Sequence, residues 1–443
     1  MFDSGEISFY VDLDAGQLDH KLGSLYASLM AEGEIYQAFQ VVERALATTQ
    51  DDRSRDAWER RRSQRIDEMR MFDPSWLPDA YIEEKSSVGL RPSVVLGMFK
   101  SSLPHSLAGY TVRTQKTLEA QQAAGFEVVP CTPLGFGDPG IPREAVGTVD
   151  YRRLRSDVDV DALDRTSTLE HNAKALFEVA LEVKPELIHA ASGFYGPDMG
   201  LVALSVARAL DRPFVYELRG LLPETWSYDG LGLKVQRQAS WLRWRQELRL
   251  ATDAAAVIAL GTNIESELIA GGVDRAKIFV VPNGVDLEEF RPSGAGRQGL
   301  IPGLDTSRPT IGYISNLGER EGHVVLVEAV AELRQRGVPV NCVIVGDGPM
   351  RPAIESAVAN QSLEGQVFVT GPVPHAEVKD YYACLDVFVV PRLDDRAARY
   401  TTPLKPFEAM AMRIPLIVSD LPALLEIVGE GGERGKAFYC GSS

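Results

Sequence analysis

Lys405 and Glu408 stand three residues apart in the run Thr401-Thr402-Pro403-Leu404-Lys405-Pro406-Phe407-Glu408, where a helix is expected to begin. A threonine can cap such a helix, and proline is tolerated in its first turn. A lysine at a helix start opposes the helix dipole unless an anion lies beside it, so we expect a phosphate near Lys405. The carboxylate of Glu408 could accept hydrogen bonds from ribose hydroxyls. The alternative for Glu408 is an acid that only interacts with the dipole, worth about 0.3–1 kcal/mol.

A second nucleotide-like feature is the turn Gly346-Asp347-Gly348-Pro349, which follows an apolar run and precedes a helical one. Strand ends beside helix starts suit a pyrophosphate, and glycines let the backbone approach it closely. A simple tight turn explains one Gly-x-Gly equally well.

These residues sit in a chain that alternates short apolar runs with amphipathic stretches from Ser93 onward, the pattern of βαβ units around parallel sheets. The fold class is therefore α/β. The first series of expected strands is 94–99, 127–131, 187–190, 214–217, 255–259 and 278–281. The second series is 310–314, 341–345, 367–370, 387–390 and 416–418.

The two series predict two Rossmann-like domains. Pro282-Asn283-Gly284 and the Gly/Pro-rich stretch that follows it break helix and strand, so we predict a first domain at 92–284, a linker at 285–308 and a second domain at 309–443. Residues 1–91 lie outside the alternation and are predicted to form a helical extension. We expect it to pack on the first domain, with an arm that binds a partner or forms a homodimer as the alternative. The charged stretch 51–70 is expected to be a solvated surface helix.

Composition excludes several classes of protein. The 443 residues are 45% hydrophobic and 24% charged, which is typical of folded globular chains. A net charge of −16 argues against binding to nucleic acid or to anionic lipid. The sequence shows no apolar run of membrane-spanning length and no signal peptide, so we expect a cytoplasmic protein. The four cysteines are scattered and are expected to be reduced.

The run from Pro403 to Met412, together with Pro282-Asn283-Gly284-Val285-Asp286, resembles family 4 of the glycosyltransferases. These are retaining enzymes of the GT-B fold, in which two Rossmann-like domains face each other across a cleft. Supporting stretches occur in the family's order at 345–349, 370–373, 381–391 and 417–422, and the likeness covers residues 92–440. The Pro-Leu-Lys-Pro sequence is similar to that of one subgroup.

The resemblance implies a nucleoside-diphosphate sugar, with UDP or GDP, as co-substrate, and neither a metal nor a further cofactor. It implies that Glu408 binds the ribose hydroxyls. The other predicted donor contacts are Gly346, Gly348, Pro372, Val373, Thr402, Leu404 and Gly109.

The sequence departs from the family pattern where the pyrophosphate is usually held. The usual arginine and lysine fall on Asn316 and Glu321, and neither is positively charged. We therefore predict that Lys405, Arg320 and Arg392 supply the catalytic positive charge for the departing phosphate. Two further departures are Tyr400, where a glutamate is familiar, and Ala191, where many relatives have a histidine.

The acceptor is expected on the first domain. His105 and Tyr110 flank Gly109 after the first strand, and Glu217 and Arg219 end a later one, where side chains face a ligand crevice. An ordinary Glu–Arg ion pair is an equal alternative for the latter two. Trp226 is a candidate for stacking on a ligand. His189 ends a strand and is expected to be either a core residue or a catalytic one.

We expect the acceptor to be a soluble small molecule of specialised metabolism. A polysaccharide or lipid-linked acceptor, an epimerase of the same fold and a non-catalytic binding or regulatory subunit stay open as alternatives. A dinucleotide oxidoreductase is disfavoured because no G-x-G-x-x-G follows the first strand. The Asp-x-Asp strings at 12–14 and 157–161 do not follow strands and are expected to be solvated acids rather than metal ligands.

Overall fold

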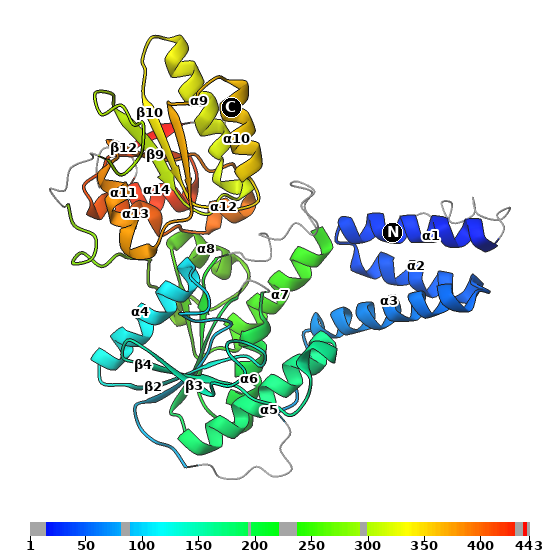
Figure 1. Ribbon diagram of the computed structural model, residues 1–443. Helices are drawn as coiled ribbons and strands as arrows, with labels where there is room; N and C mark the ends of the chain where they lie inside the picture. The colour runs from blue at the N-terminus through cyan, green and yellow to red at the C-terminus, as the bar shows by residue number, and fades with distance from the viewer. Residues whose placement is uncertain are drawn as a thin grey trace. The chain divides into compact units, whose positions relative to one another are not determined.

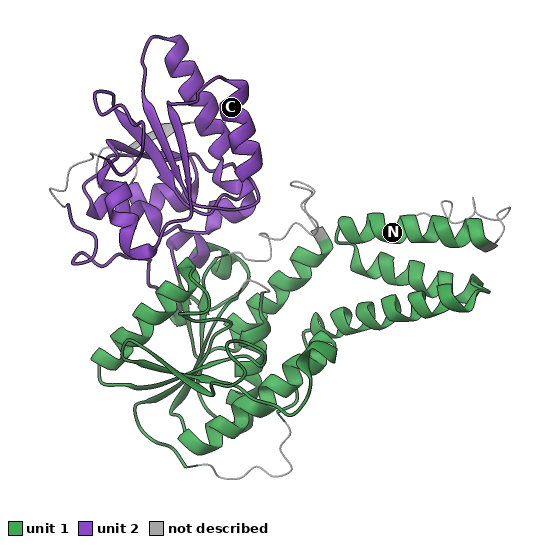
Figure 2. Ribbon diagram, viewed as in Figure 1, with its two compact units in different colours: residues 1–259, 266–279 green, residues 260–265, 280–443 purple. Residues whose placement is uncertain are grey.

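The computed structural model describes residues 15–80, 89–193, 196–220, 237–292, 299–429 and 437–440. Two compact units make up the chain, and each is described by itself (Figure 2). Unit 1 holds residues 1–259 and 266–279, and unit 2 holds residues 260–265 and 280–443. Within the described ranges, no helix combines the length and the apolar composition that crossing a bilayer requires.

Unit 1 is built on an eight-stranded sheet of order β3-β4-β2-β1-β5-β6-β7-β8. Strands β4, β2, β1, β5, β6 and β7 pair in parallel, whereas β3 pairs with β4 as an antiparallel edge hairpin. The strands are β1 (Val94–Met98), β2 (Glu127–Thr132), β3 (Arg143–Val146), β4 (Val149–Arg153), β5 (Leu187–Ala191), β6 (Phe214–Leu218), β7 (Ala256–Ala259) and β8 (Ile278–Val280).

Helices cover this sheet because its central strands are apolar on both faces, and every residue of β1 is buried. Helix α4 packs on β2 and β4, and helices α5 and α6 pack on each other and on β1. The helices are α4 (Gly109–Ala123), α5 (Arg165–Val183), α6 (Asp198–Leu210), α7 (Arg237–Asp253) and, between β7 and β8, α8 (Thr262–Ala270).

Three N-terminal helices form an arm on unit 1 (Figure 1). They are α1 (Ala15–Ala31), α2 (Ile35–Thr48) and α3 (Asp52–Met71). Around Trp58, which is 1% exposed, they share a small core of their own with Leu22, Leu29, Ala38, Val41, Val42 and Ala45. The expectation that 51–70 is only a solvated surface helix is therefore wrong in part, because one face of α3 is buried.

The arm is fastened to the rest of unit 1 mainly through its trailing segment, residues 71–80. The Gln246 amide of α7 donates to the carbonyls of Met71 at 2.6 Å and Asp73 at 3.0 Å. The Arg249 guanidinium donates to the carbonyl of Trp76 at 2.6 Å. Asp67 of α3 also accepts hydrogen bonds from the first backbone N–H groups of α5. These hydrogen bonds join the arm to the rest of unit 1.

Unit 2 is built on a six-stranded sheet of order β11-β10-β9-β12-β13-β14, with parallel pairing throughout. The strands are β9 (Thr310–Ile314), β10 (Asn341–Val345), β11 (Val367–Gly371), β12 (Val387–Val390), β13 (Leu416–Ser419) and β14 (Ala437–Cys440). The helices are α9 (His323–Gln335), α10 (Arg351–Asn360), α11 (Val378–Ala383), α12 (Arg396–Tyr400), α13 (Lys405–Ala411) and α14 (Pro422–Val428). Phe290 and Ile301 join its core.

Short 3-10 helices lie at Val160–Ala162, Arg275–Lys277, Glu319–Glu321 and His375–Glu377. Every strand expected from the two series is present, and β9, β10 and β12 have the predicted bounds. The hairpin β3–β4 was missed. Two parallel sheets with helical connections confirm the α/β class and the Rossmann-like type of both domains.

Candidate active site

The predicted donor residues of unit 2 lie at one edge of its sheet. Because all its strands run in parallel, the segments that follow β9, β10, β11 and β12 emerge at the same edge. These segments carry Arg320 and Glu321, Gly346 and Gly348, Pro372 and Val373, and Arg392. Pro372 is exposed, whereas Val373 packs against the core.

Gly346 and Gly348 let the loops after β9 and β10 approach each other. A Cβ on Gly346, whose φ is 141°, would lie 1.9 Å from the carbonyl oxygen of Ser315. A Cβ on Gly348 would lie 2.6 Å from the carbonyl oxygen of Leu317. The close approach in this structure is thus to protein backbone, which accounts for both glycines. Their contact with a nucleotide stays a prediction.

Lys405 and Glu408 contact each other on α13. The Lys405 Nζ lies 3.2 Å from Oε1 and 3.0 Å from Oε2 of Glu408. Tyr382 of α11, which is fully buried, donates its hydroxyl to Glu408 Oε2 at 2.9 Å. Glu408 is 6% exposed, so its carboxylate is held by a charge on one side and a hydroxyl on the other.

The segment before α13 differs from the expected threonine cap. Leu404 is the N-cap residue, and no side chain caps the helix. The backbone carbonyls of Thr401 and Thr402 accept hydrogen bonds from Arg392 and Asn283, both at 2.9 Å. The hydroxyls of these threonines are buried and find no hydrogen-bond partner within the described part of the chain. Buried polar atoms normally have a partner, so these two hydroxyls are unusual in being unsatisfied in this structure.

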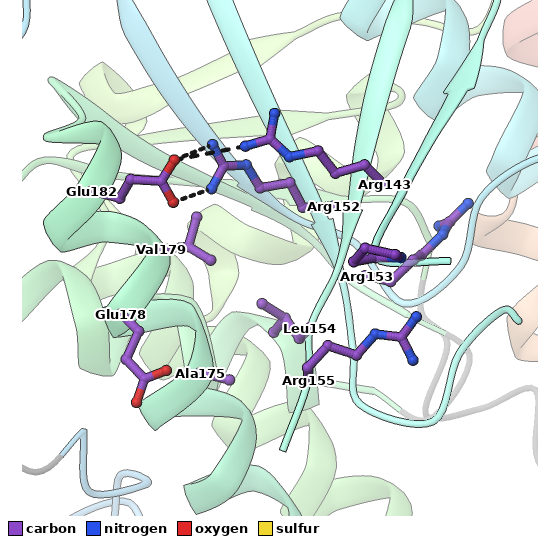
Figure 3. Close-up of a pocket in the computed structure, with 10 residues that line it drawn as sticks. Arg143, Arg152, Arg153, Leu154, Arg155, Ala175, Glu178, Val179 and Glu182 are labelled. Carbon is purple, nitrogen blue, oxygen red and sulfur yellow. Dashed lines mark hydrogen bonds and ion pairs between the residues drawn. The ribbon is translucent and has the colours of Figure 1, made fainter. Parts of the chain in front are cut away.

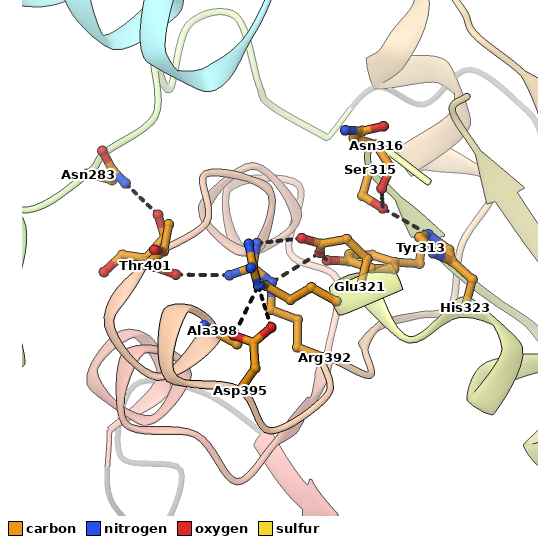
Figure 4. A network of polar contacts seen from close by, with 12 residues as sticks. Asn283, Tyr313, Ser315, Asn316, Glu321, His323, Arg392, Asp395, Ala398 and Thr401 are labelled. Atoms are coloured by element: carbon orange, nitrogen blue, oxygen red, sulfur yellow. Dashed lines mark hydrogen bonds and ion pairs between the residues drawn. The ribbon is translucent and has the colours of Figure 1, made fainter. Parts of the chain in front are cut away.

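Arg392 is held by Glu321 in a network that also includes Tyr313 (Figure 4). Its Nη2 and Nε lie 2.9 and 3.0 Å from the two carboxylate oxygens of Glu321. The Tyr313 hydroxyl donates to the same carboxylate. Burial alone would raise the pKa of Glu321, but the charge of Arg392 and the hydrogen bonds from Arg392 and Tyr313 together outweigh it, so the pKa lies below its usual range. The pair is therefore ionised.

Arg320 is paired in the same way. Its Nε donates to both carboxylate oxygens of Asp395, at 2.7 and 3.0 Å. Lys405, Arg320 and Arg392 thus each face a carboxylate, and the three cations and three anions sum to zero charge. The predicted catalytic cations are present at one sheet edge or on the following helix, but each is already neutralised.

Glu217, Arg219 and Tyr110 come together in unit 1. Glu217 accepts from Arg219 Nη2 at 2.6 Å and from Arg113 Nε at 2.7 Å. The Arg219 guanidinium lies over the Tyr110 ring, 4.5 Å from its centroid, and donates to the Tyr110 carbonyl at 2.9 Å. Glu217 and Arg219 are 1% and 6% exposed, so the pair is a buried network rather than a solvated surface contact.

Burial and the neighbouring charges determine the protonation states of Glu217 and His189. Burial alone would raise the pKa of Glu217, but Arg219 and Arg113 lower it to about 2. Burial lowers the pKa of His189 to about 4, against a smaller opposing effect of Glu217. The ring of His189 is 1% exposed, lies edge-on to Phe99, and neither of its nitrogens has a hydrogen-bond partner among the described residues. His189 is therefore neutral at pH 7.

His105 belongs to a second cluster of unit 1. Its Nε2 lies 2.8 Å from Glu144 Oε2, which also accepts from Arg153 at 2.5 Å. Gly109 is exposed at the first residue of α4. Trp226 lies outside the described residues.

Tyr382 and Arg113 were not predicted. Tyr382 reads in the sequence as one of two aromatic residues in a helix, and Arg113 as a surface residue of α4. The spacing of Tyr110 and Arg113 on one helix face was the one available signal. In the described ranges, no three His, Cys, Asp or Glu side chains are grouped as a metal site requires.

Comparison with known families gives two matches on separate segments. The family "Glycosyl transferase 4-like domain" matches residues 108–284, and the family "Glycosyl transferases group 1" matches residues 308–441. The first segment lies mostly in unit 1 and the second in unit 2.

Individual proteins agree with these matches. EpsF of Bacillus subtilis is 29% identical over 194 residues, which are 41% of this chain and 49% of EpsF. The 2-deoxystreptamine glucosyltransferase of Streptomyces kanamyceticus is 30% identical over 187 residues, 41% of this chain and 47% of that protein. The chain thus matches about half the length of these relatives.

Among solved structures, sucrose-phosphate synthase of Thermosynechococcus elongatus superposes with a TM-score of 0.62 at 21% identity, covering 78% of this chain and 85% of that one. The likeness shows the GT-B fold. Residues 108–284 and 308–441 thus each match a glycosyltransferase family, and the chain as a whole has the GT-B fold.

Proposed function

We propose that this protein is a retaining glycosyltransferase that moves a sugar from a nucleoside-diphosphate sugar to a small-molecule acceptor in the cytoplasm. The observation that carries the proposal is the contact of Lys405 with Glu408 beside Tyr382. In this proposal, the ammonium of Lys405 binds a phosphate and the neighbouring carboxylate of Glu408 binds the ribose hydroxyls.

In this proposal, departure of the nucleotide leaves negative charge on the β-phosphate. Lys405 stabilises it, and the remaining N–H groups of Arg320 and Arg392 contribute. Glu408 binds the ribose, and Thr402 is a further proposed contact of the donor. Gly346, Gly348, Pro372, Val373, Leu404 and Gly109 are further proposed donor contacts.

The departing phosphate oxygen takes the acceptor proton on the face that it leaves, so the sugar keeps its anomeric configuration and no enzyme nucleophile is needed. Positioning and electrostatic stabilisation then provide most of the catalysis. We propose that no metal takes part and that the nucleotide is UDP or GDP.

The acceptor belongs to unit 1 in this proposal. Tyr110, Glu217 and Arg219 orient it, with His105 and Trp226 as additional contacts. A small soluble acceptor is supported by the relative whose name gives 2-deoxystreptamine as the molecule it glucosylates. A polysaccharide or lipid-linked glycan is the alternative acceptor.

The test is a transfer and hydrolysis assay with UDP- and GDP-sugars, with and without EDTA. Lys405→Ala should lower kcat by about 10²–10³, because it removes one stabilising group for the leaving charge. The matched control is Lys379→Ala, a lysine elsewhere in unit 2, which should act as the wild type. Turnover that needs a divalent metal, or inversion of the anomeric configuration, would contradict those parts of the proposal.

A second candidate is a non-catalytic subunit that binds a nucleotide-sugar. The observation in its favour is that all three predicted cations are already paired with carboxylates. Binding without turnover for every donor, with Lys405→Ala abolishing the binding, would support it over the transferase.

A further inference from the structure

A pocket of about 480 Å³ lies in unit 1 between the hairpin β3–β4 and helix α5. Arginine dominates its walls, with Arg143 and Arg152 on the hairpin and Arg155 just after it (Figure 3). The facing side of α5 contributes Glu178 and Glu182. None of these residues belongs to the proposed donor or acceptor sets, so the pocket needs its own explanation.

Arg143 and Arg152 are directly opposite each other in the antiparallel pair. Like charges in that position destabilise a sheet unless an anion lies between them. Glu182 supplies one carboxylate for both, at 2.6 and 2.8 Å from Arg152 and 3.6 Å from Arg143. The other acidic neighbour of Arg143 is Asp150, whose nearest carboxylate oxygen is 3.7 Å from the guanidinium, too far for a hydrogen bond. Its guanidinium therefore keeps most of its hydrogen-bonding capacity.

The guanidinium of Arg155 keeps even more of its hydrogen-bonding capacity than that of Arg143. Its Nη2 donates to the carbonyl of Asp138 at 3.0 Å, and it has no carboxylate partner among the residues described. Arg153 also lines the pocket, but its guanidinium points away, toward Glu144 (Figure 3). The guanidinium groups of Arg143, Arg152 and Arg155 thus outnumber the carboxylates of Glu178 and Glu182 in this pocket. This excess of positive charge lies in a chain whose net charge is −16.

We propose that this pocket binds the phosphate or carboxylate of a small molecule of monosaccharide size. Planar guanidinium groups match both anions with paired N–H donors. The volume is within the range of small-molecule sites. Leu154, which is 5% exposed, supplies an apolar surface for the rest of the ligand. The proposal is independent of the transferase activity, because none of its residues belongs to the proposed donor set or to the proposed acceptor set.

The test is calorimetric titration of the full chain with glucose 6-phosphate, glucuronate and glucose. We expect saturable binding of at least one of the two anions, weaker at high salt, and none of glucose. Arg155→Gln should weaken that binding at least fivefold, and Glu178→Gln should tighten it. The matched control is Arg336→Gln, the arginine directly after α9, whose side chain is 71% exposed. It should bind as the wild type.

Lys405→Ala separates this site from the donor site. It should leave the binding of the sugar phosphate unchanged. The proposal is overturned if neither anion binds the wild type, if Arg155→Gln binds as the wild type, or if Lys405→Ala removes the binding. Whether the phosphate or the carboxylate binds more tightly identifies the anion that the pocket takes.

Discussion

Arg392 and Glu321 form a two-point ion pair, with N–O distances of 2.9 and 3.0 Å and side chains that are 9% and 15% exposed. Glu321 stands where the family resemblance leads one to expect a lysine. Arg392, which follows a different strand from Glu321, carries a positive charge in this region, and Glu321 is its counter-ion.

Removing one member of this pair should cost far more than removing both. Glu321→Leu leaves a buried guanidinium without its carboxylate, so we expect a loss of roughly 3–5 kcal/mol in unfolding free energy. The double variant Glu321→Leu/Arg392→Met should recover at least half of that loss. Urea denaturation measures both. Equal losses in the single and double variants would contradict the coupling, and normal transfer by the double variant would restrict Arg392 to a structural role.

Tyr382→Phe tests how Glu408 is held. The substitution keeps the buried ring but removes the hydroxyl that donates to Glu408 Oε2. Without it, the carboxylate is held by Lys405 alone, so we expect nucleotide binding to weaken about tenfold, one hydrogen bond to a charged group, with a smaller change in kcat. Donor KM and calorimetric nucleotide binding are the measurements. Unchanged nucleotide affinity with normal stability would rule out this role.

Gly346→Ala should disrupt the donor edge of unit 2. The added Cβ would meet the Ser315 carbonyl at 1.9 Å, and alanine is strained at a φ of 141°. We expect a loss of about 3 kcal/mol or more, or displacement of the loop after β9. Gly318→Ala, in that same loop, is the control because its φ is −91° and nothing lies within 4 Å of the added atom. Matching melting temperatures for the two variants would refute the packing argument.

His189 should make the protein less stable in mild acid. Its folded pKa of about 4 lies below the unfolded value of about 6.5, so between these values the unfolded chain binds more protons and stability falls as pH decreases. From pH 7 to pH 5 this amounts to about 2 kcal/mol. His189→Leu should lose less unfolding free energy than the wild type over that interval. The control His20→Leu, at an exposed position, should lose as much as the wild type. Identical pH profiles for all three proteins would disprove the assignment.

The arm is the proposed route to a homodimer. Ile66 of α3 and Tyr36 of α2 are each 42% exposed, and they offer apolar surface on a helical bundle with its own core. If the arm pairs with a second copy, Ile66→Glu should shift the full chain toward the monomer in analytical ultracentrifugation. A wild-type chain that sediments as a monomer at high concentration would end this proposal.

The sequence predicted the parts of the fold that depend on local pattern. Strands such as β9 and β10 are continuous apolar runs between turn signals, so their bounds can be predicted from the sequence. The bounds of strand β4 could not be predicted, because three of its five residues, Asp150, Arg152 and Arg153, are charged, and the partners that balance them lie on the unpredicted strand β3 or, for Arg152, on helix α5.

The candidate site was predictable to the same degree. Lys405 and Glu408 share one motif, so their proximity follows from helical spacing. The partners of the predicted residues could not be found this way. Arg392 is 71 residues from Glu321 and Tyr382 is 26 residues from Glu408, and only the sheet order brings such segments to one edge.

The fastening of the N-terminal helices has a consequence for how this chain can vary. Gln246 and Arg249 bind carbonyl oxygens of residues 71, 73 and 76, which every amino acid possesses. These three hydrogen bonds therefore do not depend on the side chains of residues 73 and 76, whereas Met71 and Phe72 are buried and their side chains are constrained. Helical bundles that differ in sequence before Asp67 could therefore be joined here while the sheet of unit 1 stays as it is.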